Sequence, residues 1–114
     1  MALAAGCTVV VRPASETPFS ALALAVLAER AGFPRGVFNV LIGPSREIVG
    51  EMTSDPRVRG LSFTGATPVG KQLARDCAGT LKRVSMELGS HAPFIVFDDV
   101  VLDRAVAAAI DAKF

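Results

Sequence analysis

Two short stretches of this sequence combine residue types that can perform chemistry. Residues 65–71 (GATPVGK) follow a predicted strand and open a predicted helix, so backbone amides and the positive helix end can bind an anion there. Glu87 closes a later predicted strand between the apolar residues Met86 and Leu88. A partly desolvated carboxylate suits a general base that removes a proton from water. The sequence therefore predicts an anion-binding turn. From these residues alone, a surface glutamate at a strand end is the favoured interpretation of Glu87, and a base is the alternative.

The turn at residues 65–71 nearly matches the loop G-x-x-x-x-G-K-[ST] that holds phosphate in nucleotide hydrolases. Its last position is Gln72, so the hydroxyl that would bind Mg²⁺ is missing, and Pro68 removes one backbone amide. No G-x-G-x-x-G fingerprint of ordinary dinucleotide enzymes occurs. A nucleotide-triphosphate binding module and a capped helix without a ligand therefore stand as alternatives to a dinucleotide site.

Composition excludes several other classes of protein. The chain has 114 residues, 51% of them hydrophobic and 20% charged, which is typical of at most one folded domain. The net charge is +1 and no basic stripe is interleaved with aromatics, so we expect no nucleic-acid partner. Cys7 and Cys77 are too few for a disulfide framework or a metal site, and no apolar run could span a membrane. We expect a cytoplasmic protein without a metal.

Strands and helices alternate along the chain. Strands are predicted at residues 8–12, 37–42, 61–64, 84–88 and 94–97, where short apolar or β-branched runs end at turn residues. Helices are predicted at residues 20–31, through residues 48–52, from Thr67 onward, and after Asp99. This alternation predicts an α/β fold with a largely parallel sheet, flanking helices and right-handed crossovers.

Local signals predict where the helices begin and end. Thr17 and Thr67 each precede a proline, which predicts a threonine N-cap and a proline in the first helical position. Asp99 is the predicted cap of the last helix, and Gly32 is the predicted end of the first. Val69, Leu73 and Cys77 recur at i, i+4 and i+8, which predicts one buried helix face.

Ligands of such folds bind beyond the carboxyl ends of the parallel strands. The loops expected at that edge are residues 12–18, 43–46, 65–70 and 89–92. Both stretches with chemical potential, the turn and Glu87, lie at or beside these loops. The fold therefore predicts that they meet at one edge of the sheet.

Ordered motifs along the whole chain resemble the aldehyde dehydrogenase superfamily. They are AAGCTVVVRPAS at 4–15, GVFNV at 36–40, SFTG at 62–65, SMELG at 85–89, APFIVFDD at 92–99 and AKF at 112–114. With FSALALA at 19–25, the chain is most similar to the succinate-semialdehyde dehydrogenase branch, which uses NADP⁺. The resemblance implies a variant Rossmann-type domain that lacks the usual glycine fingerprint. Residues 1–114 would then be a partial NAD(P)-binding domain, with the catalytic-cysteine and oligomerisation regions of a homo-oligomeric enzyme outside them.

The resemblance also implies a cofactor site in the loop at residues 12–15. Arg12 stands where the family has a lysine that contacts the adenosine ribose, and Pro13 and Ala14 follow it into the same site. Ser15 stands where NAD-preferring members often have a glutamate, which would repel a 2′-phosphate. Because Ser15 beside Arg12 leaves charge and a hydroxyl donor for that phosphate, we expect NADP⁺, with NAD⁺ possible.

In the same comparison, Gly65, Ala66, Thr67 and Gly70 match the turn that faces the cofactor pyrophosphate, and Leu88 is also expected to contact the cofactor. The family usually has a serine at the position of Ala66. The loss of one neutral hydrogen bond costs about 0.5–1.5 kcal/mol, which would weaken binding without abolishing it.

Glu87 matches the family's general base. The implied reaction is attack of a cysteine thiolate on an aldehyde, hydride transfer, and hydrolysis of the thioester by water that Glu87 activates. Ser90 and His91 depart from the family pattern at the following positions. The family's nucleophilic cysteine lies a few residues beyond the Lys-Phe pair with which this chain ends, and Cys7 and Cys77 are not expected to replace it.

The resemblance thus implies a fragment of an enzyme that oxidises a small aldehyde, with succinate semialdehyde to succinate as the expected reaction. The fragment alone is expected to be inactive. A non-catalytic remnant that pairs with a partner chain is a further alternative, because unpaired strand edges and apolar faces favour association.

Overall fold

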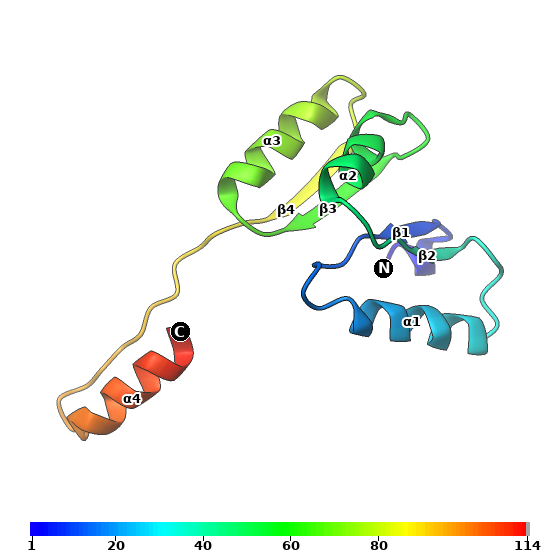
Figure 1. Cartoon of the computed structure of the whole chain (residues 1–114). Helices are drawn as coiled ribbons and strands as arrows, with labels where there is room; N and C mark the ends of the chain where they lie inside the picture. The colour runs from blue at the N-terminus through cyan, green and yellow to red at the C-terminus, as the bar shows by residue number, and fades with distance from the viewer. Residues whose placement is uncertain (114) are drawn as a thin grey trace.

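The computed structural model describes residues 1–113, which form two α/β units followed by a helical arm (Figure 1). The first unit comprises the 3₁₀ turn η1 (Leu3–Ala5), β1 (Val9–Val11), α1 (Phe19–Arg30) and β2 (Phe38–Val40). The second comprises α2 (Ser45–Ser54), β3 (Gly60–Thr64), α3 (Thr67–Ala78) and β4 (Arg83–Glu87). The arm ends in α4 (Leu102–Lys113). The predicted α/β class with parallel strands and flanking helices is confirmed.

In the first unit, α1 crosses over between two parallel strands. β1 and β2 pair in register from Val9 opposite Phe38 to Val11 opposite Val40. The side chain of Asn39 donates to the Gly36 carbonyl at 2.9 Å and to the Val9 carbonyl at 3.3 Å, which ties the turn before β2 to β1.

The end of α1 lies where the sequence predicts it. Gly32 has φ +81°, a left-handed conformation that glycine adopts without strain. The Phe33 amide then donates back to the Ala28 carbonyl at 3.0 Å, which is the bond expected when a helix ends in this way.

In the second unit, α3 crosses over between β3 and β4. These strands are parallel, with Gly60 opposite Arg83 and Thr64 opposite Glu87. The buried face of α3 consists of Gly70, Leu73 and Cys77. Two members of the predicted apolar face are therefore confirmed, whereas Val69 is 47% exposed because it lies on the solvent side of the first turn.

The buried Lys82 side chain links the start of β4 to the loop between α2 and β3. It is 8% exposed, and its Nζ donates to the carbonyls of Asp55 (2.5 Å) and Val58 (2.9 Å) in the loop between α2 and β3. The Asp55 carboxylate accepts side-chain and backbone hydrogen bonds from Arg57, which lower the pKa of Asp55 from 3.8 to about 2. The loop is thus held from two directions at the start of the β3–β4 pair.

We expect Lys82→Met to destabilise the chain by about 1–3 kcal/mol, because two partly buried carbonyls lose a charged donor while the aliphatic volume is kept. Urea unfolding followed by far-UV circular dichroism measures the change. Lys71→Met is the matched control, since Lys71 is exposed on α3. Equal losses in the two variants would contradict a specific role of the Lys82 ammonium group.

The predicted strand at residues 94–97 is wrong. No strand is present there, and all residues from 91 to 100 are exposed. An isolated extended segment is not stable as a strand, because its hydrogen bonds need a neighbouring strand. The described part of the chain places none beside it. The expectation of one sheet is wrong for the same reason: the described residues form two separate two-stranded parallel sheets.

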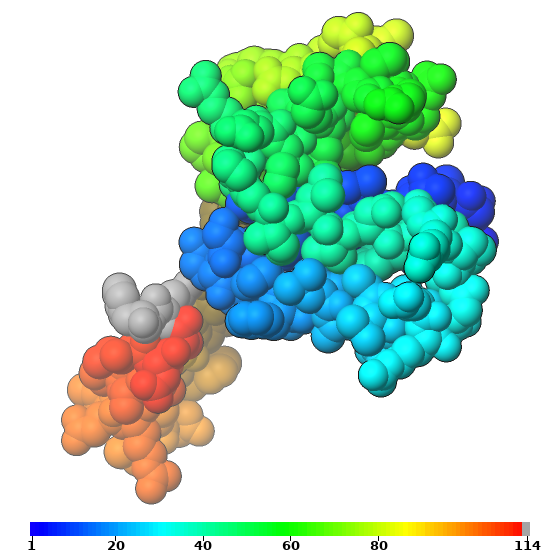
Figure 2. Space-filling model, turned by 45° about the vertical axis from the view of Figure 1, so that its right-hand side comes forward, coloured from blue at the N-terminus to red at the C-terminus, as the bar shows by residue number. Residues whose placement is uncertain are grey.

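The arm stands away from the two units, and Figure 2 shows α4 projecting from the body of the molecule. The radius of gyration is 18.8 Å. A compact domain of this length has about 13 Å. Many large apolar side chains are therefore exposed, including Leu24, Leu27, Phe97 and Ile110. Among the described residues, no helix is long and apolar enough to cross a membrane.

Three predicted helix caps are also wrong. α1 begins at Phe19 with Pro18 as N-cap, and Thr67 is the first helical residue of α3, so neither threonine caps its helix. α4 begins at Leu102, three positions after Asp99, with the Ala105 amide donating to the Val101 carbonyl at 3.1 Å. α1 and α4 start later than the local signals predict, whereas α3 starts one residue earlier.

Candidate functional site

The first half of the candidate site lies beyond the carboxyl ends of β1 and β2. There a hollow of about 240 Å³ is lined by Arg12, Pro13, Ala14, Ser15, Ile42 and Gly43. The four residues predicted from the loop after β1 thus lie in one place. The sequence predicts Gly43 in a loop at this edge but marks neither Gly43 nor Ile42 as a site residue. They lie there because parallel neighbouring strands end side by side, as the Leu41 amide bound to the Val11 carbonyl at 2.9 Å shows.

The hollow carries a positive charge that is free for a ligand. Arg12 Nη2 donates to Ser15 Oγ at 2.8 Å, which orients the guanidinium over the loop. The salt bridge found within residues 1–113 joins Arg57 to Asp55. Arg12 has no carboxylate partner among these residues. A planar guanidinium with several remaining donors, beside a hydroxyl, suits a phosphate group.

The second half lies beyond the carboxyl ends of β3 and β4. Glu87 is opposite Thr64 in the β3–β4 register, and the Gly65 amide donates to the Glu87 carbonyl at 3.0 Å. The chain leaves β4 for the arm at the same end where α3 begins (Figure 1). The predicted base and the predicted anion-binding turn are therefore adjacent, as the fold class requires.

The Glu87 side chain is exposed, which corrects the expectation of a partly desolvated carboxylate. Alternation along the strand is the reason. Successive side chains point to opposite faces, so the half-buried Met86 and Leu88 share one face, on which Leu88 packs against Gly70 of α3, and Glu87 lies on the other. The apolar neighbours in the sequence do not surround the carboxylate in space.

The amino end of α3 offers fewer amides than its glycines suggest. The Gly65 amide is bound to Glu87, and the Gly70 amide donates to the Ala66 carbonyl at 3.0 Å to close the first helical turn. Pro68 has no amide. The amides of Ala66, Thr67 and Val69 receive no acceptor from the described residues, so they are the ones available to an anion. This geometry disfavours the triphosphate-binding alternative, because a phosphate-binding loop uses its glycine amides to hold the phosphates.

Close contacts join the chain that follows β4 to the first turn of α3. A Cβ added at Gly70 would overlap Leu88 Cδ2, and one added at Gly89 would lie 3.2 Å from Thr67 Oγ1. A Cβ at Gly65 would lie 2.6 Å from Phe63 Cζ, so the ring of Phe63 covers that turn. Thr67, Gly70 and Leu88, which the sequence predicts as site residues, thus lie together, and Phe63 and Gly89 join them.

Neither cysteine is placed to act at this edge. Cys77 is 1% exposed, and burial raises the pKa of its thiol, which opposes thiolate formation. Cys7 is exposed but precedes β1, at the amino end of the sheet. His91 is exposed, and the described residues contain no group of three potential metal ligands.

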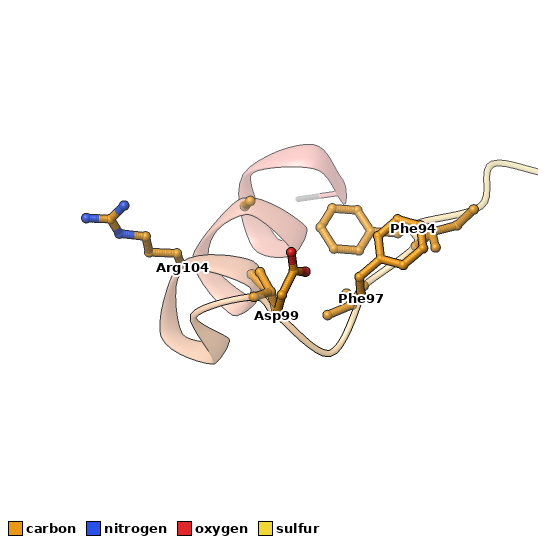
Figure 3. Close-up of a pocket in the computed structure, with 9 residues that line it drawn as sticks. Phe94, Phe97, Asp99 and Arg104 are labelled. Carbon is orange, nitrogen blue, oxygen red and sulfur yellow. The ribbon is translucent and has the colours of Figure 1, made fainter.

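A separate apolar hollow of about 280 Å³ lies within the arm. Figure 3 shows Phe94 and Phe97 on the extended segment facing the first turns of α4, while Arg104 is directed away from them. No predicted site residue lines this hollow.

The comparisons with known proteins agree with this geometry. The profile of the Aldehyde dehydrogenase family matches residues 1–114. The chain is 62% identical to succinate-semialdehyde dehydrogenase [NADP(+)] of Escherichia coli, 61% identical to glutarate-semialdehyde dehydrogenase of Pseudomonas aeruginosa and 62% identical to 3-sulfolactaldehyde dehydrogenase of Pseudomonas putida. Each alignment covers 99% of this chain and 23% of the relative, so the chain spans about a quarter of the length of these proteins.

Solved structures show the same arrangement. Succinate-semialdehyde dehydrogenase from Burkholderia pseudomallei matches with a TM-score of 0.83 at 60% identity, over 98% of this chain and 23% of that chain. A mutant aldehyde dehydrogenase from Pseudomonas syringae in complex with NAD⁺ and octanal matches with a TM-score of 0.81 at 42% identity, over 99% of this chain and 23% of that chain.

These matches cover nearly the whole chain and therefore include the arm and α4. A family profile that spans every residue, and relatives of about 60% identity over nearly the whole chain, lead to one conclusion. The chain belongs to the aldehyde dehydrogenase family.

Proposed function

We propose that this chain is the cofactor-binding and base-bearing segment of an NADP⁺-dependent aldehyde dehydrogenase that oxidises a small aldehyde carrying an acidic group. The observation that carries the proposal is the convergence at the β3–β4 edge. Glu87 lies opposite Thr64, and the Gly65 amide bonds to its carbonyl at 3.0 Å, next to the amino end of α3. The strand end that carries Glu87 thus adjoins an anion-binding helix end, and the exposed carboxylate, on the face away from α3, is open to the water from which a base would take a proton.

The residues present fit a dinucleotide phosphate. Arg12 and Ser15 would hold the phosphate on the adenosine ribose, and the amides of Ala66, Thr67 and Val69 would hold the pyrophosphate. When bound, NADP⁺ accepts the hydride that leaves the aldehyde carbon. Glu87 removes a proton from the water that releases the product. NADP⁺ is preferred over NAD⁺ because no carboxylate lines the hollow to repel the additional phosphate.

The chemistry shared by the relatives supports the substrate class. Three relatives that are 61–62% identical to this chain are named as dehydrogenases of succinate semialdehyde, glutarate semialdehyde and 3-sulfolactaldehyde. All three aldehydes carry an anionic group at the far end. Because the identities are nearly equal, residues outside this segment select among them, and succinate semialdehyde is our first choice. The nucleophilic thiolate also comes from outside these residues, since Cys77 is buried and Cys7 lies at the opposite sheet edge.

The exposed apolar surface supports an assembled enzyme. α1 is apolar around its circumference yet has no buried residue within this segment. A helix of that kind is normally covered on all sides. The remainder of the enzyme and a second copy would provide that cover, so the parent enzyme is proposed to be a homo-oligomer.

A hybrid enzyme tests the proposal. This chain replaces the aligned 113 residues of the Escherichia coli succinate-semialdehyde dehydrogenase, to which it is 62% identical. We expect the hybrid to form NADPH from succinate semialdehyde, glutarate semialdehyde or both, at a rate within about tenfold of the parent, because close relatives tolerate exchange of packed segments of matched pattern. NADPH absorbance at saturating substrate measures the rate.

Two comparisons make the result decisive. The 114-residue chain alone is expected to produce no NADPH, because it lacks a thiolate at the site. A folded hybrid that binds ATP with Mg²⁺ but neither dinucleotide in isothermal titration would overturn the proposal. So would steady NADPH formation by the isolated chain.

A further inference from the structure

Gly70 differs from the other helical glycines in the side chain that packs against its Cα. It is buried at the end of the first turn of α3, and a Cβ added there would lie 3.0 Å from Leu88 Cδ1 and 3.2 Å from Leu88 Cγ, and would overlap Cδ2. Gly79, which caps the same helix, and Gly50 in α2 have no atom within 4 Å of an added Cβ. The missing side chain of Gly70 is therefore filled by Leu88.

Leu88 directly follows Glu87, and three consecutive residues at this strand end are fixed to α3 and the turn before it. The Glu87 carbonyl accepts from the Gly65 amide at 3.0 Å. Leu88 packs on Gly70, and a Cβ added at Gly89 would lie 3.2 Å from Thr67 Oγ1. Each contact sets the direction of one residue, and together they set the face of the strand on which the Glu87 side chain lies.

We propose that Gly70 is a positioning residue for Glu87 and not a ligand of the cofactor. This inference rests on the proposed role of Glu87 as the base. Gly70 is buried and its amide is bound within the helix to the Ala66 carbonyl, so it offers the cofactor neither surface nor a donor. What it offers is the space in which Leu88 sits. Through Leu88 it holds the strand end that carries the base against the helix end that holds the anion.

A side chain at position 70 forces one of two changes. Either Leu88 rotates off α3 and releases the strand end, or the strand end moves outward by about the length of a bond. Both changes displace Glu87 from the water that it activates. A misplacement of this size can cost up to about 100-fold in a catalysed step. Hydride transfer precedes the step that needs the base, so cofactor binding and the first turnover are spared.

An exchange of size between positions 70 and 88 tests the inference in the hybrid enzyme. We expect Gly70→Ala to lower steady-state kcat by about tenfold or more while a rapid first-turnover burst of NADPH and the Kd for NADP⁺ change by less than about twofold. Leu88→Ala frees the space, so the double variant Gly70→Ala/Leu88→Ala is expected to match Leu88→Ala alone within about twofold. Gly79→Ala is the control and leaves kcat unchanged, because its added methyl meets nothing.

The outcomes separate this inference from its alternatives. If Gly70→Ala weakens NADP⁺ binding equally with leucine or alanine at position 88, Gly70 contacts the cofactor and the inference is wrong. If Gly70→Ala does not fold, the comparison of Leu88→Ala with the double variant still decides, because the inference requires the two to be equal. Retained turnover in Glu87→Gln would instead refute the proposed function, whatever the result at position 70.

Discussion

Glu87→Gln in the hybrid enzyme is expected to lower steady-state turnover by about 10²–10⁴-fold, the usual loss when a general base is removed. Glutamine keeps the size and the hydrogen-bonding shape of the side chain but cannot take a proton from water. The first turnover of NADPH should persist as a burst, because the base acts after hydride transfer. Stopped-flow absorbance gives the burst and the steady rate in one trace.

Glu51→Gln is the matched control, since Glu51 is also exposed but lies on α2. It should leave both phases unchanged. The assignment of Glu87 fails if its glutamine variant turns over at the rate of the control, or if the burst is lost together with the steady rate. The second result would mean that Glu87 is needed for binding or for hydride transfer.

Ser15→Glu is expected to weaken NADP⁺ binding by about 100-fold. The new carboxylate would lie beside Arg12, whose Nη2 is 2.8 Å from Ser15 Oγ, so it would neutralise the guanidinium and repel a ribose phosphate. Two like charges about 4 Å apart near a protein surface interact by about 4 kcal/mol, and every 1.4 kcal/mol changes the affinity about tenfold. Solvent screening at this exposed site makes 100-fold the expected net effect.

NAD⁺ lacks the additional phosphate, so its affinity should change little or increase. Ser15→Gln is the control for side-chain size, and it should keep most of the preference for NADP⁺. Isothermal titration of the hybrid with both dinucleotides at low and high salt measures the effect, which should shrink as salt rises. Equal losses for NAD⁺ and NADP⁺ would show that Ser15 does not face the phosphate.

Much of the fold follows from local signals. The order of strands and helices, the parallel pairing and the end of α1 at Gly32 are all present in short windows of sequence. They depend on β-branched runs, on apolar spacing and on the freedom of glycine at positive φ. The same windows place Arg12, Ser15, Gly65 and Glu87 at the carboxyl ends of strands, because that position follows from strand order alone.

Other features depend on segments that are distant in the sequence. Residues 94–97 have the composition of a strand but need a neighbour that the described chain does not place beside them. The late starts of α1 and α4 show the same limit at the scale of one turn, because the backbone and its packing override a favourable cap residue.

The sequence alone therefore determined the family, the α/β order and the edge at which the chemistry lies. The tertiary structure decided how the parts of that edge fit. Glycine at position 70 is compatible with a ligand contact or with a packing space, and only the structure shows that the side chain of Leu88 fills that space. Glu87 stands between two apolar residues in the sequence but is exposed in the fold, because strand alternation sends Met86 and Leu88 to the opposite face. A residue type and its spacing specify which groups are present, whereas burial and contact arise only when distant segments meet.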